Sequence, residues 1–142
     1  MPTFRLNKLV RSRIPELCAE LGQQADVKKL TGIKLQQAIT DKITEEAAEL
    51  KAGGTIDSGE LADLLQLIDD AAFVTGLSRD DIELLRKEKE EKKGACIFVD
   101  ENGRAAGYYI SSIICDENDK WVEYYRKDPA RFPEIPDGQN DL

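Results

Sequence analysis

The sequence predicts a mostly α-helical bundle with a small β-hairpin and a short final helix near its C-terminus. Two long stretches, 33–52 and 58–75, repeat apolar side chains at helical spacing, and glycine follows each of them. In a third stretch, 79–93, the charges separate onto opposite faces of a helix. Beyond residue 94, short apolar runs flank a polar turn, which is typical of a hairpin.

The composition favours a single soluble globular domain over residues 1–142. The chain is long enough for a proper core, with 34% of its residues charged and 41% hydrophobic. A formal net charge of -8 argues against a nucleic-acid partner, and no apolar run is long enough to span a membrane. The first residues lack the apolar core of a signal peptide. Three widely spaced cysteines fit reduced thiols, so we expect a cytoplasmic protein.

Caps and glycines mark the ends of the expected helices, which begin with a short one over 15–21. The expected N-caps of the three longer helices are Thr31, Asp57 or Ser58, and Ser78. The expected C-terminal stops are Gly22, Gly53–Gly54, Gly76 and Gly94. The last 48 residues, 95–142, then hold a hairpin with a turn at 101–104, a short helix over 120–127 and a polar, proline-rich tail. Most of the aromatic residues lie here, where they pack on the helices, stack on a base or form a dimer contact.

Two acidic groups carry the main functional signal, and they are Glu45-Glu46-x-x-Glu49 and Glu60-x-x-Asp63. In the helical phase of the first group, Glu46 falls inside the apolar stripe and Glu49 at its edge. In the second group, Glu60 falls inside the stripe and Asp63 at its edge. A carboxylate on a core face is costly unless it is paired or bound to a metal. Facing helices with such side chains predict an oxygen-rich cage for Mg²⁺.

The same residues also allow an interpretation without a metal. Asp57 precedes Glu60 by three residues, which resembles a capping box at the start of the second long helix. Glu46 and Glu49 would then lie on an ordinary helix surface, with Lys42 and Glu46 as an i, i+4 ion pair. Both interpretations stay open at this point.

The chain contains no histidine, which removes the commonest general base and the usual zinc and triad chemistry. Catalysis would depend on carboxylates, lysines, arginines or a metal. Basic residues are grouped in two places, an N-terminal arm over 3–14 and the end of the third long helix. Each group either faces an anion or is a solvated surface, and cations are favourable at a helix C-terminus in any case.

These motifs together resemble those of a known superfamily. The motifs are Lys8-Leu9-Val10-Arg11 with Ile14-Pro15, the two acidic groups, and the basic run 86–94. They are similar to the all-α nucleoside triphosphate pyrophosphatases, which include MazG-like enzymes, dimeric dUTPases and phosphoribosyl-ATP pyrophosphohydrolase. The similarity covers about residues 4–94 and favours the MazG-like, phosphoribosyl-ATP pyrophosphohydrolase-like house-cleaning branch. It implies an all-α NTP-pyrophosphatase-like helical bundle, with the hairpin as an addition.

The resemblance also implies an activity and a set of site residues. The activity is Mg²⁺-dependent hydrolysis of a nucleoside triphosphate between its α- and β-phosphates, with Mn²⁺ as a second candidate cation. The implied metal ligands are Glu46, Glu49, Glu60 and Asp63. The implied catalytic residues are Glu46 and Glu45, the latter orienting a water. The implied phosphate-binding residues are Lys8, Arg11, Arg86, Lys89, Lys92 and Lys93. Such enzymes work as dimers or tetramers, so a homo-oligomer is expected.

Two rival functions remain. One is a non-catalytic helical module whose apolar faces bind a second copy or a partner helix. The other keeps the site but takes phosphoribosyl-ATP as its substrate. Ten residues separate Glu49 from Glu60, a shorter interval than in many MazG-like proteins, and this departure leaves the base preference open.

Overall fold

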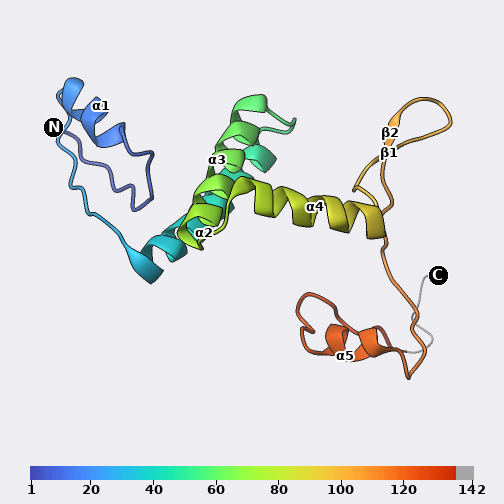
Figure 1. Cartoon of the computed structure of the whole chain (residues 1–142). Coiled ribbons are helices and arrows are strands. Elements are labelled where there is room, and N and C mark those ends of the chain that lie inside the picture. Colours follow the sequence, from blue (N-terminus) through green and yellow to red (C-terminus); the bar gives the residue numbers. More distant parts are fainter. Residues whose placement is uncertain (137–142) are drawn as a thin grey trace. The chain divides into compact units, whose positions relative to one another are not determined.

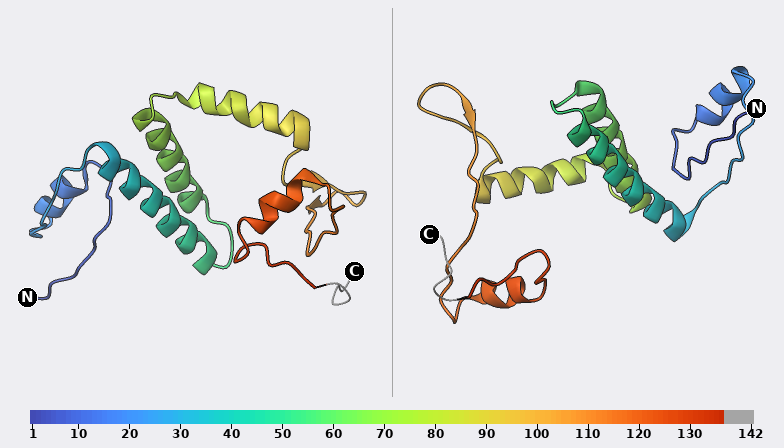
Figure 2. Two further views of the ribbon diagram at one scale, coloured as in Figure 1. Left: turned by 90° about the horizontal axis from the view of Figure 1, so that it is seen from below. Right: turned by 180° about the vertical axis from the view of Figure 1, so that it is seen from behind.

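Two long helices, α2 (Gly32–Ala52) and α3 (Ser58–Val74), lie side by side in the computed structural model and run in opposite directions (Figures 1 and 2). The structure describes residues 1–136. Its chain forms two compact units, Met1–Lys93 and Gly94–Leu142, and each is described separately. The predicted mostly α fold with a small hairpin and a short last helix is confirmed. The prediction of a single domain stays a prediction.

The turn between α2 and α3 shows why the second helix begins where it does. Asp57 is the N-cap, and its Oδ1 accepts hydrogen bonds from the backbone N–H of Gly59 at 2.7 Å and of Glu60 at 3.3 Å. Gly54 has a φ of 76°, which other residues rarely adopt. The capping prediction for Asp57 is therefore confirmed, and the cap places Glu60 in the first turn of α3. Thr31 precedes α2 as expected, but its side chain makes no capping hydrogen bond.

The third long helix, α4 (Arg79–Lys93), follows α3 after a short turn and contacts it. Ser78 Oγ accepts from the backbone N–H of Asp81 at 3.2 Å, and Asp81 Oδ2 accepts from the backbone N–H of Ser78 at 2.7 Å. These reciprocal bonds satisfy two donors at the start of the helix. Arg79 Nε lies 3.3 Å from Asp69 Oδ1, so an ion pair also joins this end of α4 to α3.

The first helix, α1 (Ile14–Glu20), is short, has Pro15 in its first turn and is followed by Gly22 with a φ of 72°. The arm before it reaches the central helix pair through two cations. Lys8 pairs with Glu45 of α2, and Arg11 pairs with Asp63 of α3.

The core of the first unit is small. Among the described residues, only three apolar side chains are buried, and they are Ile39, Leu67 and Ala72. Much of the apolar stripe of α3 is exposed. Its large exposed side chains are Leu61 at 48% and Leu65 and Ile68 at 45% each. Helices α2 and α4, which contact α3, cover only part of this stripe, and this leaves an apolar face on the unit.

The second unit contains the hairpin and the last helix. Strands β1 (Phe98–Val99) and β2 (Ala105–Ala106) are antiparallel, with Phe98 opposite Ala106. The two strands are shorter than the apolar runs that flank the predicted turn. From Gly107 to the start of α5 the chain forms no further strand. Helix α5 (Lys120–Arg126) has Asp119 as its N-cap. Residues 137–142, the end of the predicted polar tail, lie outside the described residues.

The helices of residues 1–136 include none with both the length and the apolar character needed to cross a membrane.

Candidate metal centre

The acidic residues of the two predicted groups meet between α2 and α3. One carboxylate oxygen from each of Glu46, Glu60 and Asp63 lies within 4.8 Å of the others. A second group with the same spacing consists of Glu45, Glu46 and Glu49. Glu46 belongs to both groups, so it joins the ligands of one helix to those of the other. We call Glu45, Glu46, Glu49, Glu60 and Asp63 the carboxylate cluster, and it could hold a metal ion.

Glu46 is the one charged residue buried in the described part of the chain, with 6% of its surface exposed. Its Oε1 lies 3.4 Å from the ammonium of Lys42, while its buried Oε2 has no hydrogen-bond partner. Glu60 also has a buried Oε2 without a partner. Buried carboxylate oxygens without donors are costly, and a cation could partner each of them.

The raised pKa of Glu60 also indicates an excess of negative charge in the cluster. A hydrogen bond with Glu46, loss of solvent and repulsion by Glu49, Glu46 and Asp63 raise the pKa of Glu60 to about 7. Two carboxylates can share a hydrogen bond only when one of them is protonated. With both ionised, no donor is left for the buried Oε2 of either side chain. The cluster therefore carries more negative charge than its own groups neutralise, and a divalent cation would relieve it.

Lys42 also belongs to the site. The sequence predicted it only as an ion-pair partner of Glu46 in the interpretation without a metal. It donates a hydrogen bond to Glu45 Oε1 at 3.0 Å and lies 3.4 Å from Glu46 Oε1. Partial burial disfavours its charge, but hydrogen bonds with Glu45 and Glu46 outweigh this and raise the pKa of Lys42. The hydrogen bond from Lys42 in turn lowers the pKa of Glu45. The i, i+4 spacing of Lys42 and Glu46 was the sequence signal for this contact. The predicted ion pair and the carboxylate cluster are both present in the structure.

Two predicted phosphate-binding residues of the arm also reach the cluster. Lys8 Nζ lies 3.5 Å from Glu45 Oε1. Arg11 Nη2 donates to Asp63 Oδ1 at 2.6 Å. The arm cations therefore occupy carboxylates at the edge of the cluster, one on each helix.

The predicted basic residues of α4 have different surroundings. Arg86 donates to Glu83 at 2.7 Å and to Glu90 at 2.6 Å, and these bonds raise the pKa of Arg86 further above its usual range. Lys89, Lys92 and Lys93 are exposed at the end of the helix. Across residues 1–136, no ion pair joins these four side chains to the carboxylate cluster. Their role toward phosphate stays a prediction.

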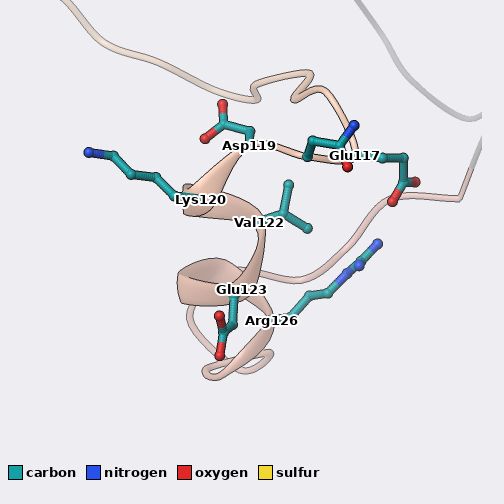
Figure 3. A pocket seen from close by; sticks show the side chains of 7 residues that line it. Glu117, Asp119, Lys120, Val122, Glu123 and Arg126 are labelled. Carbon is teal, nitrogen blue, oxygen red and sulfur yellow. The ribbon is translucent and has the colours of Figure 1, made fainter.

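An open pocket among the described residues touches the cluster. A hollow of about 290 Å³ is lined by Glu49, Leu50, Gly53, Thr55, Asp57 and Glu60. A larger one of about 430 Å³ is lined by residues of α5 and of the turn before it, among them Lys120, Glu123 and Arg126 (Figure 3). Figure 3 shows charged side chains of both signs spread around the helix, with no convergent group. The smaller pocket is the better candidate for a substrate site because Glu49 and Glu60 line it.

Comparisons with protein-family models, with curated proteins and with solved structures each found no match. The resemblance of the motifs to the all-α nucleoside triphosphate pyrophosphatases therefore stays a prediction.

Proposed function

We propose that this protein is a divalent-cation-dependent nucleoside triphosphate pyrophosphohydrolase. It would cleave between the α- and β-phosphates to give a nucleoside monophosphate and pyrophosphate, as a house-cleaning enzyme for non-canonical nucleotides. Mg²⁺ is the expected cation and Mn²⁺ the second candidate. The motif resemblance supplies the reaction class. The observation that carries the proposal is Glu46, a buried carboxylate with one unpartnered oxygen. One of its oxygens lies within 4.8 Å of oxygens of Glu60 and Asp63 on the neighbouring helix.

The donor set fits a hard cation. All of the side chains concerned offer carboxylate oxygens, which Mg²⁺ and Mn²⁺ prefer, and there is no thiol or imidazole among them. Glu46, Glu49, Glu60 and Asp63 would hold the ion. When bound, such an ion polarises a phosphate and lowers the pKa of a coordinated water.

The residues of the chain have distinct tasks in this proposal. Glu45 is the group that orients the attacking water. The pKa of Glu45 is lowered, chiefly by the hydrogen bond from Lys42. Its carboxyl group is therefore ionised at neutral pH and accepts hydrogen bonds. Glu60, with a pKa of about 7, can hold or release a proton near neutrality. The basic residues of the arm and of α4 would neutralise the leaving pyrophosphate.

A second candidate is a non-catalytic helical interaction module, and the exposed apolar stripe of α3 favours it. The two candidates are compatible in one respect, because a homo-oligomer, dimer or tetramer, would cover this stripe. They differ in their response to a cation. A bound ion stabilises the folded enzyme by mass action, whereas an interaction module without a metal site shows no such response.

The test is a panel of canonical and modified nucleoside triphosphates with Mg²⁺, assayed separately for pyrophosphate and orthophosphate. The proposal expects pyrophosphate and the matching monophosphate from at least one nucleotide, and loss of this release in Glu46→Gln. Phosphoribosyl-ATP is included, and cleavage of that compound alone would favour the biosynthetic alternative. No pyrophosphate from any member and no thermal response to Mg²⁺ would favour the interaction module.

A further inference from the structure

We propose that Lys8 and Arg11 of the N-terminal arm are built-in counter-ions that compete with a divalent cation for the carboxylate cluster and leave it when the cation binds. This inference rests on the proposed metal site. It adds a regulation of that site, because the arm cations change from partners of the carboxylates to free groups near the bound ion.

The contacts of the arm place one cation on each central helix. Arg11 Nη2 donates to Asp63 Oδ1 at 2.6 Å, across 52 residues of sequence. Lys8 Nζ lies 3.5 Å from Glu45 Oε1. A guanidinium at this distance makes a charge-assisted hydrogen bond to a carboxylate that the proposed metal site also uses. A cation bound at Asp63 would therefore meet the positive charge of Arg11 directly.

The rest of the arm is only lightly attached. Within residues 1–10 of the described chain, no backbone–backbone hydrogen bond to another residue is formed. Phe4 and Leu6 are exposed, at 78% and 61%, and only Leu9 and Val10 are half-buried. The Arg11–Asp63 pair is itself open to water, with 58% and 40% of the two side chains exposed. Exposed ion pairs contribute little stability, so a divalent cation can displace them.

Lys42 is held more firmly at the cluster than the two cations of the arm. It lies on the same helix as its two partners, and only 15% of its side chain is exposed. Lys42 therefore stays with Glu45 and Glu46 when a metal binds. The arm brings two further positive charges from outside the helix pair, and these are the ones that can leave.

The first experiment measures Mg²⁺ affinity by calorimetry at low ionic strength for the full chain and for Arg11→Gln. Loss of the competing guanidinium is expected to tighten Mg²⁺ binding about two- to fivefold, the range that the loss of one exposed ion pair corresponds to. Arg13→Gln is the matched control, because it removes the same charge from the next basic position. Arg13 pairs with Glu16 of its own helix at 3.5 Å and does not touch the cluster. The Mg²⁺ affinity of Arg13→Gln should equal that of the wild type.

The second experiment follows the arm itself in the wild-type chain by limited trypsin digestion and mass spectrometry. Saturating Mg²⁺ is expected to accelerate cleavage after Lys8 and Arg11, and this acceleration should be absent in Glu46→Gln.

The outcomes separate the two proposals. Mg²⁺ binding with unchanged or weaker affinity in Arg11→Gln, or slower cleavage of the arm, overturns the counter-ion role and leaves the metal site standing. No Mg²⁺ binding in either form overturns both proposals. Binding that appears only in Arg11→Gln supports the competition strongly.

Discussion

At the scale of single residues, Glu46 is the position on which the candidate site depends. Its helical phase placed it inside the apolar stripe of α2, and the structure buries it there. Lys42 pairs with only one of its two oxygens, and the other has no partner. The carboxylate also lies close to those of Glu60 and Asp63 on α3. Lys42 on the same helix therefore pairs with one oxygen of Glu46, and the other oxygen is free to bind a cation.

Replacing Glu46 by glutamine should remove the response of the protein to Mg²⁺. At a cation concentration about a hundred times the dissociation constant, the wild type should gain about 2.7 kcal/mol of stability. Glu46→Gln keeps the size of the side chain but loses the charge, so its melting temperature should not change with Mg²⁺. Differential scanning fluorimetry measures this. The control is Glu88→Gln on exposed α4, which should respond as the wild type does, and an equal response of both variants would contradict the assignment.

Glu60 predicts a pH dependence of the metal-free protein. Its pKa in the folded state is about 7, above the ordinary value of 4.5, so the fold favours its protonated form. Its contribution to stability is fully present below pH 4.5 and is lost as the pH rises through 7. Urea unfolding in the presence of a chelator should therefore show a fall in stability between these pH values, and the fall should be smaller in Glu60→Gln. A fall of the same size in the variant would contradict the pKa shift.

At the scale of elements, the helices begin and end where local chemistry directs them. Asp57 caps α3 through two backbone N–H groups, and Ser78 and Asp81 form reciprocal bonds at the start of α4. These bonds involve residues two or three positions apart, so the sequence contains all of the information. The strands of the hairpin are shorter than predicted because pairing depends on partners further along the chain.

The cap at Asp57 can be tested by Asp57→Ala. The loss of its two hydrogen bonds should lower the free energy of unfolding by about 1 kcal/mol. The neighbouring Ser58→Ala is the control, because Ser58 is the first residue of the helix and alanine is a better helix former. Urea denaturation monitored by circular dichroism at 222 nm compares them. Equal stability of Asp57→Ala and the wild type would show that the cap has no energetic weight.

At the scale of the whole molecule, the first unit buries too little apolar surface to account for the apolar pattern of its sequence. Three buried apolar side chains are few for a helical unit of this size, and the stripe of α3 remains exposed. A second copy of the chain that packs on this stripe would complete the core.

Self-association should therefore depend on the exposed stripe of α3. Ile68→Glu introduces a charge at a side chain that is 45% exposed in the single chain. Because burial of such a side chain contributes about 1.5–3 kcal/mol, self-association should weaken at least about tenfold. Light scattering after size-exclusion chromatography measures the mass. Ile56→Glu, in the exposed turn before α3, is the control. A wild-type protein that is monomeric at all concentrations would contradict the proposal.

The sequence by itself determined the helices, their caps and the phase of the acidic residues, because each depends on neighbours within one or two turns. It also placed Glu46 and Glu60 on the faces that meet. Only the tertiary structure decided which groups share the site. It added Lys42 to Glu45 and Glu46, brought Arg11 to Asp63 across 52 residues, and formed no ion pair between the described carboxylate cluster and the basic residues of α4. Such contacts depend on how helices pack, and periodicity along one helix carries no information about the partner that its charged residues meet.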